Sequence, residues 1–146
     1  MNISTVDDIA NATSPDELPE LDTEELARAI AMMAAEKKAE NIVALRVREL
    51  VQYTDYFVVC SGRSDRQVAA IREHLQRQVR SALDLRATSV EGNGTNQWVI
   101  LDYGDVVVHI FFEPVREYYQ LERLWSDAPR VDLGLPEPVR RDPYSN

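Results

Sequence analysis

Two aspartates, Asp102 and Asp105, flank a predicted turn and are the first candidates for chemistry in this sequence. Paired carboxylates can hold Mg²⁺ or act as general acid and base. A nucleotidyltransferase site needs two carboxylates two positions apart on one strand, because alternate residues of a strand project from the same face. Asp102 and Asp105 are three positions apart, and we predict that they lie on different strands. The spacing therefore argues against a catalytic pair of this kind.

A second candidate is the sequence Ser61-Gly62, followed by Ser64. Its residue types resemble the Gly-Ser turn that binds phosphate in nucleotidyltransferases. The same residues also fit a structural turn followed by a helix cap, and the motif is too short to be specific. Both interpretations stay open on the residues alone.

Histidine and cysteine give no catalytic or metal site. His109 lies inside an apolar run, and Cys60 ends another, so both suit a buried strand better than a ligand or a base. His74 falls beside the apolar face of a predicted helix. Two distant histidines and one cysteine do not make a zinc set. No Gly-rich nucleotide loop, nucleophile elbow or metalloprotease helix is present, so we expect no catalytic residue, no metal and no cofactor.

A group of aromatic side chains is the strongest candidate for binding. Five tryptophan and tyrosine residues lie within 28 positions, and acidic residues are interleaved with them. Aromatic residues are common interface anchors, and an acidic rim suits a basic protein partner. Core packing explains some of them equally well, because Tyr118 and Trp125 have the spacing of a buried helix face. The aromatic residues are Trp98, Tyr103, Tyr118, Tyr119 and Trp125, and the acids are Asp102, Asp105, Glu117, Glu122 and Asp127.

Two helices in the first half of the chain are predicted from their caps and apolar faces. Asp22 and Ser64 are the expected N-caps, each followed three residues later by Glu or Gln, as in a capping box. The first helix ends near residue 40. The apolar faces are Leu26, Ile30, Met33 and Ala34 in the first helix and Val68, Ile71, Leu75, Val79 and Ala82 in the second.

Runs of β-branched and aromatic residues predict five strands. A final helix is predicted after the last strand. The last two strands are joined by Tyr103-Gly104, which suits the two-residue turn of a hairpin. Pro114 fits the first turn of the helix. One side of this helix carries Tyr118, Leu121, Leu124 and Trp125. The strands are residues 41–47, 53–60, 86–91, 97–102 and 105–112.

This order of elements predicts an α/β (α+β) fold, a mixed sheet with packed helices in a single domain at residues 22–128. Residues 1–21 are predicted to be a disordered acidic extension, because the first 25 residues hold eight acids and no base. Residues 129–146 are predicted to form a Pro-rich extended tail.

The charge of the predicted domain argues against direct nucleic-acid binding. Residues 26–128 contain 14 acids and 13 bases, so we see no basic stripe that would hold a phosphate backbone. No run approaches the ~18 apolar residues of a membrane span, and the acidic N-terminus does not fit a secretory signal. A single cysteine excludes an internal disulfide. We expect a cytoplasmic protein that does not bind membranes.

Three segments resemble the ribosomal silencing factor (Iojap-like) family. The segment WVILDYGDVVVHIFFEPVREYYQLERLWSDA, residues 98–128, closely resembles that family, and its part from Trp98 to Trp125 is highly specific to it. The segments TDYFVVCSGRSDRQVAAI, residues 54–71, and Val90-Glu91-Gly92 are also similar to it. The resemblance covers residues 23–128. Phe112 departs from the pattern, since relatives often have a polar residue at this position.

The resemblance implies a nucleotidyltransferase-like fold without a working nucleotidyltransferase site, and so no enzyme. It implies binding to the large ribosomal subunit through ribosomal protein number fourteen. This binding would block association with the small subunit and lower translation under nutrient limitation. A homodimer of the free protein is also implied. We expect the partner-binding residues to be Trp98, Asp102, Tyr103, Gly104, Asp105, Tyr118, Leu121 and Trp125. The alternative that the residues leave open is a divergent nucleotidyltransferase.

Overall fold

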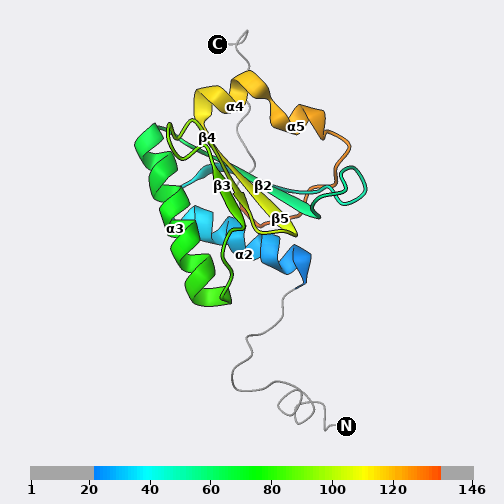
Figure 1. Ribbon diagram of the computed structural model, residues 1–146. Coiled ribbons are helices and arrows are strands. Elements are labelled where there is room, and N and C mark those ends of the chain that lie inside the picture. Colours follow the sequence, from blue (N-terminus) through cyan, green and yellow to red (C-terminus); the bar gives the residue numbers. More distant parts are fainter. Residues whose placement is uncertain (1–21, 136–146) are drawn as a thin grey trace, which may run out of the picture.

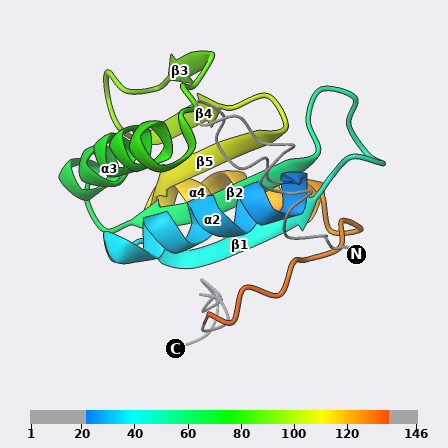
Figure 2. The same cartoon turned by 90° about the horizontal axis from the view of Figure 1, so that it is seen from below.

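The computed structural model describes residues 22–135 as a five-stranded mixed sheet with helices on both faces (Figure 1). The predicted extension at residues 1–21 and the end of the predicted tail lie outside the described residues. Helices α2 and α3 cover one face, and α4 and α5 pack across part of the other (Figure 2). The mixed sheet with packed helices is therefore confirmed. The helices are α2 (Thr23–Glu36), α3 (Asp65–Leu83), α4 (Glu113–Tyr119) and α5 (Leu121–Leu124).

Both predicted N-caps are present. The Asp22 carboxylate accepts a hydrogen bond from the Glu25 backbone N–H at 2.8 Å, and the Glu25 carboxylate accepts one from the Asp22 N–H at 3.2 Å. The Ser64 hydroxyl accepts from the Gln67 N–H at 3.0 Å. The Gln67 side chain accepts from the N–H of Arg63, at 2.7 Å, and not from that of the cap residue. These bonds satisfy backbone donors that a helix N-terminus otherwise leaves unpaired.

The centre of the sheet is a parallel pair of strands from distant parts of the chain. Strands β2 and β5 pair in parallel through seven residues, from Tyr56 opposite Val106 to Gly62 opposite Phe112. All other pairs are antiparallel, in the order β1-β2-β5-β4-β3. The strands are β1 (Glu40–Arg46), β2 (Tyr56–Gly62), β3 (Ser89–Glu91), β4 (Trp98–Asp102) and β5 (Val106–Phe112). β2 begins three residues later than predicted, because Tyr53 lies in the preceding loop with 64% of its surface exposed.

Each face of the sheet has its own hydrophobic core. The larger core lies between the sheet and α2 and α3, and includes Ile30, Ile71 and Leu101. The smaller core lies on the other face, and includes Phe57, Phe111 and Leu121. Most predicted core residues of both helices are buried, but Met33 is only partly buried and Ala82 is exposed at the end of α3.

The β4–β5 hairpin is confirmed, but its turn has three residues and not the two predicted. The Tyr103 N–H donates to the Val106 carbonyl at 2.9 Å, and Gly104 has a φ of +86° that favours glycine. The Asp102 carboxylate accepts from the Gly104 N–H at 2.8 Å. Asp105 leaves the β4–β5 ladder because its carbonyl accepts from the N–H groups of residues 55 and 56.

The prediction of one continuous last helix is wrong. Gln120 has a left-handed conformation, with φ 49° and ψ 52°, and separates α4 from the single turn α5. The break changes the direction of the side chains that follow it. Tyr118 and Leu124 are 80% and 70% exposed, whereas Leu121 is 8% exposed. These residues therefore do not share one buried side as the helical spacing predicted.

Part of the predicted tail lies along the outer edge of β1. The Arg46 N–H donates to the Pro129 carbonyl at 2.8 Å, and the Val131 N–H donates to the Ala44 carbonyl at 2.9 Å. Val131, Leu133 and Leu135 pack against the larger core. The segment is extended, as predicted, and it pairs with a strand edge that would otherwise be open.

Candidate protein interface

Strand β4 has an apolar surface on both of its faces. Val99 and Leu101 are buried beneath α2 and α3. Trp98 and Ile100 point to the opposite face, where both remain half-exposed. A strand covered on both faces is usually apolar throughout, but β4 is covered by helices on one face alone. We call the second face, centred on Trp98 and Ile100, the open face.

A cluster of aromatic rings holds Trp98 in place on the open face. The Trp98 ring stacks on Phe111 with centroids 4.8 Å apart and contacts Tyr119 at 5.1 Å. The Trp98 Nε1–H donates to Nδ1 of His109 at 3.1 Å. Trp98 is therefore a fixed, half-exposed indole, which is the form an interface anchor takes when little side-chain entropy is lost on binding.

The aromatic cluster continues across β2 to α5. The Phe57 ring lies 4.8 Å from His109 and 6.0 Å from Trp125, measured between ring centroids. Trp125 is half-exposed, so it extends the apolar surface that begins at Trp98.

His109 is a neutral packing residue within this cluster. Its Nδ1 accepts the bond from Trp98, so the neutral ring carries its proton on Nε2. The Nε2 atom is buried and has no hydrogen-bond partner among the described residues. Burial lowers the pKa of His109 to about 4. His109 is thus uncharged at neutral pH, which agrees with its predicted position in the sheet.

Acidic and further aromatic side chains surround the open face. Glu91 and Ser89 of β3 pair with Ile100 and Asp102, and paired residues of neighbouring strands point to the same side. At the far end of β4, burial and the charge of Asp102 together raise the pKa of Tyr53, whose ring centroid lies 6.2 Å from that of Phe57. The apolar centre therefore has carboxylates along its β3 edge.

The structure brings only part of the predicted site together. Trp98 and Trp125 lie on the open face, and Asp102 lies on the same face four residues along β4. Gly104 and Asp105 are exposed in the turn beyond Asp102. At the Trp98 end, the Tyr118 ring contacts Tyr119, which in turn contacts Trp98.

Two predicted site residues occupy other positions. Tyr103 packs against the larger core on the α3 side of the sheet, because it continues the alternation of β4 and shares the face of Val99 and Leu101. Leu121 is buried in the smaller core. A single flat partner on the open face can reach neither side chain directly.

Three residues at this surface were not among the predicted contacts, namely Tyr53, Ile100 and Tyr119. Ile100 could have been found from the pattern of β4, where apolar residues occupy both alternating positions of a strand near the sheet edge. Tyr53 lies in the loop before β2, for which the sequence has no strong marker.

A buried ion pair fixes α4 and α5 to the end of the sheet. Arg116 is 5% exposed and donates to both carboxylate oxygens of Glu122 at 2.9 Å. Its third bond goes to the Ser61 hydroxyl at 2.8 Å. The Ser61-Gly62 sequence ends β2, and a Cβ added to Gly62 would lie 3.0 Å from the Val68 side chain. Ser61 and Gly62 thus make structural contacts from the end of a strand and not from the predicted turn, whereas Ser64 is the predicted helix cap.

Cys60 has no nucleophilic character in the fold. It is fully buried, and burial raises the pKa of its thiol to about 12. Within residues 22–135, no group of three or more His, Cys, Asp or Glu side chains could hold a metal ion. In the same part of the chain no helix is long and apolar enough to cross a membrane.

The family model for "Ribosomal silencing factor during starvation" matches residues 20–146. The chain belongs to the ribosomal silencing factor family. It is 39% identical over 113 residues to Ribosomal silencing factor RsfS of Halalkalibacterium halodurans, covering 77% of this chain and 96% of that protein. The Bacillus subtilis protein of the same name is 42% identical over 100 residues, covering 68% of this chain and 84% of that protein.

The silencing factor fold is also similar to solved structures. A crystal structure from Chromobacterium violaceum has a TM-score of 0.70 and 29% identity, covering 73% of this chain and 88% of that one.

A mouse protein named Mitochondrial assembly of ribosomal large subunit protein 1 is 31% identical in sequence over 100 residues, covering 66% of this chain and 43% of that protein.

Proposed function

We propose that this silencing factor binds the large ribosomal subunit through ribosomal protein number fourteen and blocks association with the small subunit. Translation would fall as a result when nutrients are limited. The family description supports silencing during starvation, and the name of the mouse relative connects that protein with the large subunit. The site of action would be the cytoplasm.

The observation that carries this proposal is the open face. Its centre is a half-exposed tryptophan and isoleucine, and carboxylates lie along its edge. Interface centres are rich in aromatic residues and their rims are polar. A basic ribosomal protein surface would give Glu91 and Asp102 charged partners.

The proposed mechanism is steric exclusion and needs no chemistry. The factor and the small subunit would compete for one surface of the large subunit. At a free concentration about 50 times its dissociation constant, the factor would shift subunit joining by roughly 2.3 kcal/mol. Affinity and bulk are sufficient for this effect, so we propose that the protein is not an enzyme.

Substitution of Ile100 tests the proposed surface. Ile100→Glu places a charge at the centre of the open face, and a charge buried without a partner is costly. We expect co-sedimentation with isolated large subunits to weaken by about 30-fold or more, and subunit joining to proceed. The matched control is Met32→Glu on α2, because Met32 is also a partly exposed apolar residue, at 39%, on the other side of the molecule. An Ile100→Glu variant that stays folded and binds like the Met32→Glu control would contradict the proposal.

The hairpin turn is proposed to extend this interface by charge. The double variant Asp102→Asn/Asp105→Asn removes two charges but keeps an acceptor for the Gly104 N–H. We expect several-fold weaker binding with a smaller dependence on salt. If the double variant binds as tightly as the parent at low salt, the turn is not part of the interface.

Two other possibilities have direct tests. A divergent nucleotidyltransferase would show Mg²⁺-dependent nucleotide transfer that is lost in Asp102→Ala, and we expect no such transfer. A homodimer of the free protein would cover the open face, and sedimentation velocity of the parent and of Ile100→Glu would detect it.

A further inference from the structure

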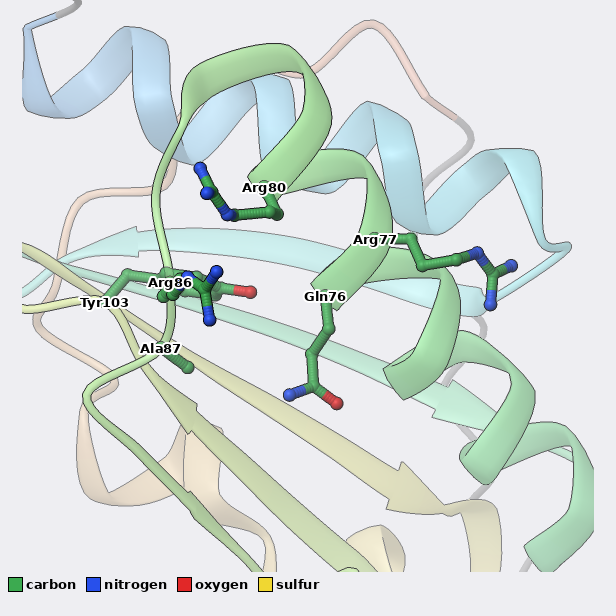
Figure 3. Close-up of a pocket in the computed structure, with 6 residues that line it drawn as sticks. All are labelled: Gln76, Arg77, Arg80, Arg86, Ala87 and Tyr103. Carbon is green, nitrogen blue, oxygen red and sulfur yellow. The ribbon is translucent and has the colours of Figure 1, made fainter.

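A cleft of about 410 Å³ lies beside the second half of α3, on the side of the sheet away from the open face (Figure 3). Helix α3, the loop that follows it, and the β4–β5 turn contribute its walls. The lining residues are Gln76, Arg77, Arg80, Arg86, Ala87 and Tyr103.

The cleft concentrates positive charge in a chain whose net charge is −9. Three of its six lining residues are arginines, and none is an acid. Arg80 forms an ion pair with Asp84 next to the cleft. Arg86 makes no ion pair with any described residue, and the Arg77 side chain, also without an ion pair among these residues, points away from Arg80 and Arg86 in Figure 3. The uncompensated charge favours an anionic ligand.

The remaining polar groups of the cleft also present donors. The carbonyl oxygen of the Gln76 side chain accepts from Arg72 at 2.9 Å, which leaves its NH₂ group for another partner. The Tyr103 hydroxyl is buried without a hydrogen-bond partner among residues 22–135, and in Figure 3 it points from the turn toward α3. Burial raises the pKa of Tyr103 to about 12, so the hydroxyl keeps its proton. A ligand made of acceptor atoms would satisfy all of these groups.

We propose that this cleft binds the phosphate groups of a small phosphorylated ligand of nucleotide size, held by Arg80, Arg86 and the Tyr103 hydroxyl. Guanidinium groups bind phosphate oxygens through paired hydrogen bonds. The volume exceeds that of one phosphate and falls in the range of small-molecule sites, roughly 300–1,000 Å³. Ala87 and the Tyr103 ring supply an apolar wall for the attached group.

A small ligand fits these observations better than a nucleic-acid strand. Strand binding uses a basic groove with successive stacking platforms, whereas this cleft has one aromatic lining residue, Tyr103. The cleft and the open face lie on opposite sides of the sheet, so both can be occupied at once. The proposal therefore does not depend on binding to the ribosome.

Calorimetric titration of the full chain tests the proposal with three probes: pyrophosphate, ATP, and a short single-stranded RNA. We expect ATP to bind more tightly than pyrophosphate, and RNA to bind no more tightly than ATP. Arg80→Ala/Arg86→Ala should weaken ATP binding by about 10-fold or more, because both guanidinium partners of the phosphate groups are lost. Tyr103→Phe should weaken it several-fold without lowering the melting temperature.

The matched control is Lys37→Ala/Arg66→Ala, which also removes two exposed positive charges but leaves the cleft intact. It should bind ATP like the parent. The proposal is overturned if no probe binds at millimolar concentration, if the control loses as much affinity as Arg80→Ala/Arg86→Ala, or if RNA alone binds.

Discussion

His109 is neutral in the folded protein, and this makes stability depend on pH. Its pKa is about 4 when folded and about 6.5 when unfolded. As the pH falls below 6.5, His109 takes up a proton in the unfolded chain but stays neutral in the folded chain. The free energy of unfolding therefore decreases between pH 6.5 and pH 4, and this contribution levels off below pH 4.

We expect His109 to lower the free energy of unfolding by roughly 2 kcal/mol between pH 7 and pH 4.5. Urea unfolding at the two pH values measures the change. His109→Gln keeps an acceptor for the Trp98 indole but does not titrate, so its pH dependence should be smaller by about this amount. An equal pH dependence in the parent and in His109→Gln would show that the histidine is charged or accessible in the fold.

The backbone conformation and surroundings of Gly92 accommodate only glycine. It has a φ of +82°, and a Cβ atom at this position would lie 1.8 Å from the Trp98 carbonyl oxygen. We expect Gly92→Ala to destabilise the protein by about 2 kcal/mol or more, because it adds both left-handed strain and a backbone clash. Gly94→Ala is the control, since a Cβ there meets nothing within 4 Å. In thermal unfolding, the melting temperature should fall for Gly92→Ala and stay unchanged for Gly94→Ala.

At the scale of elements, local patterns predicted α2, α3 and the hairpin because their determinants lie close together in the sequence. The Asp22 and Ser64 caps bond to residues three positions away. The break at Gln120 was not predicted, since glutamine is uncommon in the left-handed conformation and carries no marker for it. The contact that stabilises α4 next to this break could not be predicted either, because Arg116 bonds to Ser61, 55 residues away.

The candidate site shows the same division between local and distant information. Trp98 and Asp102 lie on one face because alternate residues of a strand share a face, and their role in binding stays a prediction. The same alternation places Tyr103 with Val99 and Leu101 on the α3 side of the sheet. The contacts of Tyr119 and Trp125 on the open face follow the break at Gln120 and could not be predicted from local patterns. The likeness to nucleotidyltransferases stays a prediction.

The segment along β1 should contribute measurably to stability. A chain that ends at residue 128 loses two backbone hydrogen bonds to β1 and the apolar cover from Val131, Leu133 and Leu135. We expect it to be less stable by about 3 kcal/mol than a chain that ends at residue 135. Urea unfolding of the two truncated chains makes the comparison, and equal midpoints would show that the segment adds no stability.

At the scale of the whole molecule, we predict that the acidic N-terminal residues are dispensable for the fold. Deletion of residues 1–20 keeps Asp22 and its capping box. The deleted chain should therefore melt at nearly the same temperature and bind large subunits with nearly the same affinity. A decrease in melting temperature of about 5 °C or more would show that these residues contribute about 1 kcal/mol to the folded domain.

The parallel pairing of β2 with β5 constrains when the protein can fold. Every residue of β2 pairs with a residue 50 positions later in the chain, and closing a loop of that length costs roughly 3.5 kcal/mol of chain entropy, before any constant term. Until residue 112 has been synthesised, β2 has no partner on that side, and the cores on both faces of the sheet lack β5. The α4 and α5 turns follow still later. A nascent copy therefore remains without its open face until almost the whole domain has left the ribosome that is making it.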